Sequence, residues 1–283
     1  MSRRAALALG FVAGVWCLTA GLTASPVAAA RQATAAAPAK PAALSDAEIE
    51  RFLLNGKVTK TRGAGKGVTG SLRGTMTDGT LTHDVHIQPI DETKKEFRSQ
   101  QGTEFNFRDY WAFNVAAYKI DRLIGLGLVP VSVERRWKTA PAAYSWWLDD
   151  VLMEEGDRLK RKTSPPNLVR WNEQMQMVRL FDQLIANIDR NLGNLMITND
   201  WTIWAIDHTR AFRTNSKLKT PGNIARCDRE IFARLKQLDK TSLKNAVQGH
   251  LQPYEIESVL KRRDEIVDII EKRGEAGLFD WVR

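Results

Sequence analysis

Apolar residues recur at helical spacing through much of the second half of the chain. The spacing predicts a long helix that leads up to residue 185, and further helices near residues 227–238, 241–249 and 253–273. The apolar stripe of the first of these helices consists of Leu168, Trp171, Met175, Val178, Phe181 and Ile185. We therefore expect this half of the protein to be mostly helical.

The first half of the chain has a different pattern, in which short runs rich in Thr and Val are separated by glycines. Residues 57–92 predict strands with a hairpin turn at Asp78-Gly79, and residues 129–137 predict a further strand. Residues 144–153 predict another strand or a strand that runs into a connector. Ahead of them, the motif Ser45-Asp-Ala-Glu48 is a capping box, which predicts a short helix that ends near Leu54.

Two segments between these strands complete the first half. Residues 94–106 are polar and are expected to form a loop, whereas residues 107–126 carry an apolar stripe at helical spacing. Strands with one main helix, followed by a mostly helical region, predict an α+β fold with two lobes around a cleft. We expect a small β-rich N-lobe at residues 45–155 and a helical C-lobe at residues 156–283.

Residues 184–212 combine a predicted hairpin with polar residues at both of its ends. Two apolar runs, 195–198 and 201–206, are split by Asn199-Asp200, residue types that suit a tight turn. Asp189 and Asn194 precede the hairpin, and Asp207 follows it. Phosphoryl transfer uses a carboxylate to orient the attacking hydroxyl, and an amide and a second carboxylate to hold Mg²⁺ on the phosphates. The segment is therefore a candidate for this chemistry.

A glycine-rich motif in the first half bears on whether a nucleotide site is present. Gly65, Gly67 and Gly70 match the spacing G-x-G-x-x-G, but strands rather than a helix are predicted to follow, which disfavours a dinucleotide-binding fold. Lys66 is followed by glycine, so the motif is not a Walker A loop either. A glycine-rich hairpin that covers phosphates fits the pattern better. A plain flexible hairpin remains the alternative.

The N-terminus has the features of a secretory signal peptide at residues 1–30. Arg3-Arg4 precede an apolar run, and Ala28–Ala30 provide a small-residue cleavage site. An uncleaved membrane anchor is the alternative, and either way the domain is expected outside the cytoplasm, periplasmic or secreted. Residues 31–44 are rich in Ala and Pro and indicate a linker. We expect no transmembrane segment in the chain after cleavage.

Charge and cysteine content narrow the expected partners. The net charge of +9 falls to +7 without residues 1–30. This positive charge favours an anionic surface as a partner, and the alternative is that it serves only to keep the protein in solution. No zinc-finger or aromatic-basic RNA motif is present, so nucleic acid is not expected. Without Cys17 in the signal peptide, Cys227 is alone and forms no intrachain disulfide.

Two motifs in residues 184–212 resemble the kinase superfamily, in particular the atypical branch of phosphatidylinositol 3-/4-kinases, secreted Golgi-type kinases and persistence-toxin kinases. IDRNLGN resembles the catalytic loop D-R-x-x-x-N, and AIDHTRAF resembles the metal-binding segment I-D-x-x-x-A-F of type II phosphatidylinositol 4-kinases. The resemblance implies ATP and Mg²⁺ as cofactors. It implies Asp189 as the catalytic Asp, with Arg190 beside it bracing the catalytic loop, and Asn194 and Asp207 as metal ligands.

Weaker similarities extend the resemblance into the first half. HIQPIDE resembles V-F-K-P-x-D-E and NVAAY resembles E-x-A-A-Y, which places Gln88 and Asn114 where the branch has a Lys–Glu ion pair. Lys66 or Arg73 is then the candidate for the missing cation on the phosphates. Residues 151–154, with Met153, are expected to form the hinge that contacts adenine.

Three functions are open from the sequence. The first is an exported kinase that transfers the ATP γ-phosphate to a hydroxyl of a protein, lipid or glycan. The second is a pseudokinase that binds a nucleotide or a partner without phosphotransfer. The third is a non-kinase binding domain in which the spacing is coincidental: Asp189-Arg190 is then a buried ion pair that closes a helix, Asn194 a turn residue and Asp207 a cap.

Overall fold

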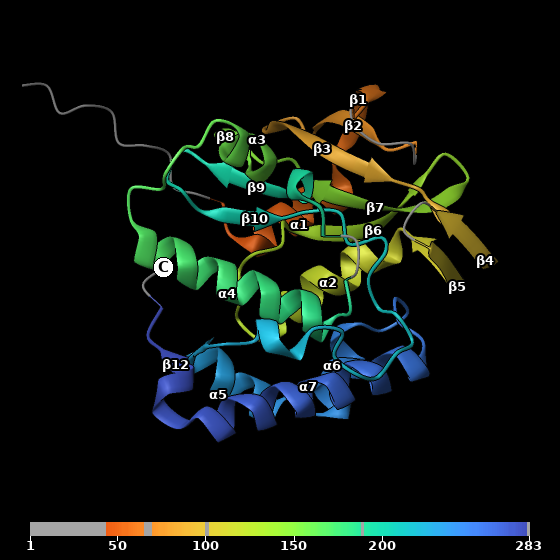
Figure 1. Cartoon of the computed structure of the whole chain (residues 1–283). Helices are drawn as coiled ribbons and strands as arrows, with labels where there is room; N and C mark the ends of the chain where they lie inside the picture. The colour runs from red at the N-terminus through yellow and green to blue at the C-terminus, as the bar shows by residue number, and fades with distance from the viewer. Residues whose placement is uncertain (1–43, 65–69, 100–101, 188–189, 282–283) are drawn as a thin grey trace, which may run out of the picture. The chain divides into compact units, whose positions relative to one another are not determined.

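The computed structural model describes residues 44–64, 70–99, 102–187 and 190–281 (Figure 1). Leu44–Arg283 form one compact unit. The predicted signal peptide and all of the predicted linker except Leu44 lie outside the described residues, and so do Gly65, Lys66, Gly67 and Asp189. No helix in the described part of the chain has the length and apolar content needed to cross a bilayer.

The unit begins with α1 (Asp46–Asn55), which has the predicted capping box. The Ser45 hydroxyl accepts from the Glu48 amide at 3.3 Å, and the Glu48 carboxylate accepts from the Ser45 amide at 2.8 Å. This exchange satisfies two amides that a helix N-terminus otherwise leaves without partners. The helix buries Phe52 and Leu53 against the sheet described next. The prediction of a short helix here is confirmed.

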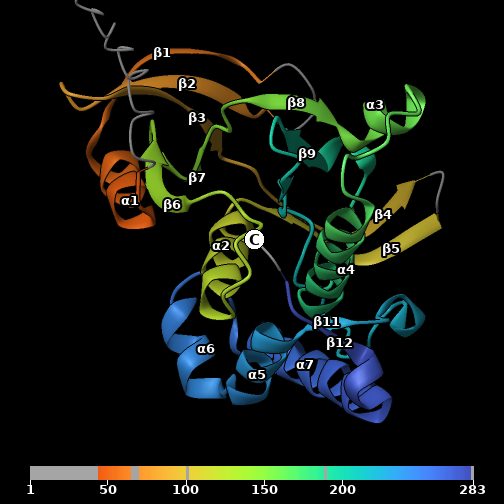
Figure 2. The ribbon, with the colours of Figure 1, turned by 90° about the vertical axis from the view of Figure 1, so that its left-hand side faces the viewer.

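Five antiparallel strands form the main sheet, shown at the top of Figures 1 and 2. In sheet order they are β1 (Lys57–Gly63), β2 (Leu72–Thr77), β3 (Thr82–Gln88), β7 (Ala140–Trp146) and β6 (Ser132–Trp137). The predicted turn joins β2 to β3, where the Asp78 carboxylate accepts from the amides of Thr80 and Leu81 and Gly79 has φ +95°. On β3, Val85 and Ile87 face the core, and alternation puts His86 and Gln88 on the other face.

The predicted loop at residues 94–106 is wrong, because the segment is a hairpin of β4 (Asp91–Ser99) and β5 (Gly102–Tyr110). The main helix accordingly begins later than predicted, as α2 (Ala112–Leu123). The hairpin was not predicted because β4 and β5 are rich in charged residues and lack the alternating apolar pattern typical of strands. Contacts between rings and cations support it: the Phe97 and Phe107 rings lie 4.4 Å apart, and the Arg210 guanidinium lies 4.3 Å from the Phe107 ring centre.

A second, three-stranded sheet contains the predicted hairpin and has the order β10–β9–β8. Its strands are β8 (Val151–Glu154), β9 (Leu195–Thr198) and β10 (Ile203–Ala205). The turn differs from the expected one in detail, because the positive φ of 63° belongs to Trp201. Asp200 instead ties the turn with its side chain, which accepts from the Thr198 and Thr202 hydroxyls and the Thr202 amide.

The last three helices, α5, α6 and α7, lie on the side of α2 and α4 away from the main sheet, whereas α3 lies beside β8 (Figure 2). The predicted helices are all present, and the last has the predicted bounds. The elements after β8 are α3 (Glu155–Lys160), α4 (Leu168–Leu184), α5 (Arg229–Gln237), α6 (Lys240–Ala246), α7 (Pro253–Arg273), the parallel pair β11 (Cys227–Asp228) and β12 (Leu278–Phe279), and 3₁₀ turns at Leu192–Asn194, Pro221–Asn223 and Gly274–Gly277. Cys227 is buried and free.

Candidate functional site

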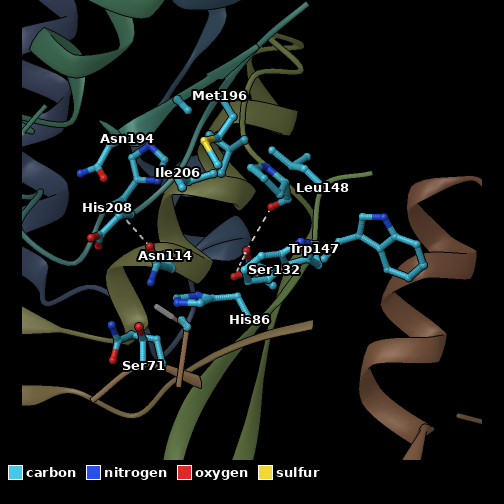
Figure 3. Close-up of a pocket in the computed structure, with 18 of the residues that line it drawn as sticks. Ser71, His86, Asn114, Ser132, Trp147, Leu148, Asn194, Met196, Ile206 and His208 are labelled. Atoms are coloured by element: carbon cyan, nitrogen blue, oxygen red, sulfur yellow. Dashed lines mark hydrogen bonds between the residues drawn. The ribbon is translucent and has the colours of Figure 1, made fainter. Parts of the chain in front are cut away.

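A pocket of about 570 Å³ lies between residues of the main sheet, α2 and the three-stranded sheet (Figure 3). Four of the residues predicted from sequence line it: Gln88, Asn114, Asn194 and Asp207. They come from β3, from α2 and from the two ends of the β9–β10 hairpin. Tertiary packing thus brings together positions that are far apart in the sequence.

The two uncharged residues in the Lys–Glu slots are both buried, Gln88 with 1% and Asn114 with 5% of its surface exposed. The Gln88 side-chain oxygen accepts from the Ile90 amide at 3.2 Å. The Asn114 side-chain oxygen accepts from the His208 amide at 2.8 Å, a contact drawn in Figure 3. Asn114 therefore connects α2 directly to the backbone that follows Asp207.

The two predicted metal ligands are held beside each other by the hairpin between them. Asn194 ends the 3₁₀ turn before β9, and its carbonyl accepts from the Ile206 amide at 3.0 Å, one residue before Asp207. Asp207 adopts φ 54°, a left-handed conformation in which Asp is enriched among non-glycine residues. Its carboxylate accepts from the Thr209 hydroxyl at 3.0 Å.

Arg190 is turned into the protein and braces the site from behind. Its guanidinium donates to the Asp182 carboxylate on α4 at 3.0 Å and to the carbonyls of Asn194 and Ile206 at 3.0 and 2.7 Å. It also donates to His208 Nε2 at 2.9 Å. The residue does not appear among those that line the pocket. Arg190 therefore positions the backbone on both sides of the hairpin.

Two histidines line the pocket, and sequence reasoning gave neither of them a role. His208 Nε2 must act as an acceptor, because arginine only donates, so the ring is neutral with its proton on Nδ1. Burial and the Arg190 charge hold the pKa of His208 well below its usual value. Burial also lowers the pKa of His86, an effect that the negative charge of Asp207 opposes.

The described lining residues contain two carboxylates, Glu154 and Asp207, and neither lysine nor arginine. Arg73, one candidate for a cation on phosphates, donates to the Asp84 carboxylate at 2.6 Å and stacks 4.2 Å from the Trp147 ring centre. Arg73 is therefore held by Asp84 and by Trp147, a lining residue, and does not itself line the pocket. The other candidate, Lys66, lies outside the described residues.

Of the other predicted positions that the structure describes, some line the pocket and some do not. Ala64 and Ser71 flank the glycine-rich segment, line the pocket and share a backbone hydrogen bond of 3.1 Å. Gly70 is exposed with φ +67°. In the predicted hinge, Val151 and Glu154 line the pocket, whereas Met153 packs against the hydrophobic core.

The donor set fits a hard divalent cation. Asn194 and Asp207 offer amide and carboxylate oxygens, which Mg²⁺ prefers, and Mg²⁺ is usually held by one or two carboxylates with substrate phosphates. Within the described ranges, no group of three or more His, Cys, Asp or Glu residues is placed to hold a metal by itself. A metal held by Asn194 and Asp207 would therefore take further ligands from outside this pair, such as waters or the phosphates of a bound nucleotide.

Comparison with known proteins identifies the fold. No protein-family model and no curated protein matches the chain. Hydra Fam20, solved with a sugar, has 16% sequence identity and a TM-score of 0.60, covering 83% of this chain and 93% of its own. The Helicobacter pylori proinflammatory kinase CtkA has 11% identity and a TM-score of 0.45, covering 78% of this chain and 96% of its own. The likeness to Fam20 confirms the prediction of an α+β, kinase-like fold, and it concerns the fold alone.

Proposed function

We propose that this protein is an Mg²⁺-dependent phosphotransferase that moves the γ-phosphate of ATP to a hydroxyl group of a protein, lipid or glycan. The observation that carries the proposal is the convergence of Gln88, Asn114, Asn194 and Asp207 on one pocket. Each of these residues was selected from a separate sequence motif. An accidental match to one motif would not make the others meet it in space.

Each residue has a separate task in this proposal. Asp189 orients the acceptor hydroxyl, and Asn194 and Asp207 hold Mg²⁺, which when bound offsets the negative charge of the phosphates. Gly65, Lys66, Gly67 and Gly70 cover the nucleotide. Arg190 and Asn114 fix the backbone around Asp207 through the contacts described above. We place the N-lobe at residues 45–155 and the C-lobe at residues 156–283, with the nucleotide between them.

A second candidate is a pseudokinase that binds a nucleotide or partner without transferring phosphate. Gln88 and Asn114 carry no charge, and the described pocket lining has no lysine or arginine. A cation on the phosphates is often a large part of the electrostatic stabilisation of the transition state. Without a cation from Lys66, the metal would be the main positive charge on the phosphates, which is the situation that favours a pseudokinase.

We further propose that the protein is exported by residues 1–30 and acts outside the cytoplasm, where its positive charge suits an anionic acceptor or surface. The resemblance of AIDHTRAF to the metal-binding segment of type II phosphatidylinositol 4-kinases supports membership of the phosphatidylinositol-kinase-like branch as part of this proposal. Fusing residues 1–30 to a reporter that is active only after export tests the first statement. A reporter that stays inactive and uncleaved would contradict it.

The enzymatic proposal is tested by ATP binding and phosphate transfer with the same preparations. We expect isothermal titration to show ATP binding that EDTA removes, and labelled ATP to transfer phosphate to a protein, lipid or glycan pool. Asp207→Ala should abolish transfer and weaken metal-dependent binding, whereas Asp268→Ala, on the exposed face of α7, should change neither. Binding without transfer would select the pseudokinase, and absence of binding with any divalent metal would refute both candidates.

A further inference from the structure

Asp109, near the end of β5, is a buried carboxylate outside every motif identified in the sequence. Only 6% of its surface is exposed, and its Oδ1 has no hydrogen-bond partner among the described residues. The burial alternation of β5 turns Asp109 inward with Phe107. A buried carboxylate oxygen without a partner costs free energy, so the structure needs a reason to keep it.

The surroundings of Asp109 connect it to the predicted metal ligand Asp207. The Thr209 hydroxyl, which donates to Asp207 at 3.0 Å, also interacts with the Asp109 carboxylate. The next residue along β5, Tyr110, donates its amide to the Thr209 carbonyl at 2.9 Å. The end of β5 is thus bonded to the segment that carries Asp207, and one threonine contacts both carboxylates.

The charge around Asp109 is mostly negative. Glu92 lies directly across the β4–β5 ladder, and both Glu92 and Asp207 repel a charge on Asp109. Burial, with these two acids, raises the pKa of Asp109. Arg210 supplies an opposing positive charge, but its guanidinium also donates to Glu104 at 2.6 Å and stacks on Phe107. A divalent cation would satisfy the free oxygen and remove the repulsion at once.

We infer that Asp109 belongs to the metal centre, where its Oδ1 binds the divalent cation held by Asp207, either directly or through one of the waters on that cation. Mg²⁺ and Mn²⁺ are the fitting ions, because both prefer oxygen ligands and retain waters. This inference rests on the proposed function. It adds a second carboxylate, from the strand-rich part of the chain, to the two ligands that flank the β9–β10 hairpin.

Mn²⁺ binding, followed by the electron paramagnetic resonance signal of free Mn²⁺, tests the inference without measuring activity. Asp109→Asn keeps the size of the side chain and removes its charge. We expect Mn²⁺ affinity to fall by about 10–100-fold, as for other residues that support a metal. In EDTA, the melting temperature should equal or exceed that of the wild type, because the repulsion from Asp207 and Glu92 is gone. Asp109→Glu should recover part of the affinity.

Asp84→Asn is the matched control, since Asp84 is a carboxylate on β3 that Arg73 and Thr75 already satisfy. It should lower the melting temperature and leave Mn²⁺ affinity unchanged. Wild-type affinity in Asp109→Asn would overturn the inference, as would a loss of stability in EDTA like that of Asp84→Asn. The proposed function would survive the failure of the Asp109 inference if the wild type binds Mn²⁺ and Asp207→Asn abolishes that binding. A wild type that binds no Mn²⁺ would refute both.

Discussion

Replacing Arg190 by methionine should be one of the most damaging single substitutions available in this protein. The guanidinium joins Asp182 on α4 to the carbonyls on both sides of the β9–β10 hairpin. The side chains of Arg190 and Asp182 are only 11% and 10% exposed, so solvent screens their attraction weakly. Methionine fills part of the volume but leaves the Asp182 carboxylate with the neutral Asn187 amide and no cation, and it removes one donor from each of the two carbonyls.

The size of the effect follows from the burial of the pair. Removing one partner of a buried ion pair destabilises a protein by about 3–5 kcal/mol, because an uncompensated charge stays inside. For a folded unit of this length, each kcal/mol lowers the melting temperature by about 2–4 °C. We therefore expect Arg190→Met to melt about 6–20 °C below the wild type. The backbone of Asn194 and Ile206 should also loosen, so metal-dependent nucleotide binding should weaken in the protein that remains folded.

Urea unfolding at two or more temperatures measures the change in the free energy of unfolding, and thermal melting followed by circular dichroism measures the change in melting temperature. Arg161→Met is the control, because Arg161 and Asp157 are 63% and 42% exposed, with 3.8 Å between their charged atoms. An exposed pair of this kind contributes about 0–1 kcal/mol. The double variant Asp182→Leu/Arg190→Met removes both charges and should be more stable than the sum of the single variants predicts.

An Arg190→Met variant within about 1 kcal/mol of the wild type would refute this reasoning, since 3 kcal/mol is the least expected for a buried pair. Strict additivity in the double variant would also refute it. Additivity would mean that Arg190 and Asp182 stabilise the protein independently, and that the cost of Arg190→Met does not come from the stranded Asp182 charge.

Two further predictions concern buried titratable groups away from the pocket. Burial raises the pKa of Asp121 to about 6, above its unfolded value near 3.8, so the folded state binds the proton more tightly than the unfolded state. Protonated Asp121 therefore contributes stability below about pH 4, and this contribution is lost as the pH rises from about 4 to 6. That loss of about 3 kcal/mol should be missing from Asp121→Asn when its urea unfolding is compared with the wild type across this pH range. Burial raises the pKa of the Cys227 thiol, so in a Cys17→Ser background Ellman's reagent should react only as urea unfolds the protein; rapid reaction of the folded protein would contradict the burial.

The local elements of this fold were largely predictable from the sequence. The capping box at Ser45 and Glu48, the helix at residues 253–273 and the hairpin split by Asn199-Asp200 all depend on contacts between residues close in the chain. The β4–β5 hairpin was missed because no alternating apolar pattern marks it. Its stability comes partly from Arg210, a residue about a hundred positions later, which a pattern read along the chain does not reveal.

For the candidate site too, some properties follow from the sequence and others only from the tertiary structure. The sequence by itself determined which residue types are present at Gln88, Asn114, Asn194 and Asp207, because motif spacing is a property of the chain. Only the tertiary structure decided that these residues meet in one pocket, that Arg190 turns inward and that Asp109 lies beside Thr209 with an unpaired oxygen. The physical reason is that helix caps and tight turns form between neighbours in the sequence, whereas burial, charge and long-range hydrogen bonds depend on which distant segments pack together.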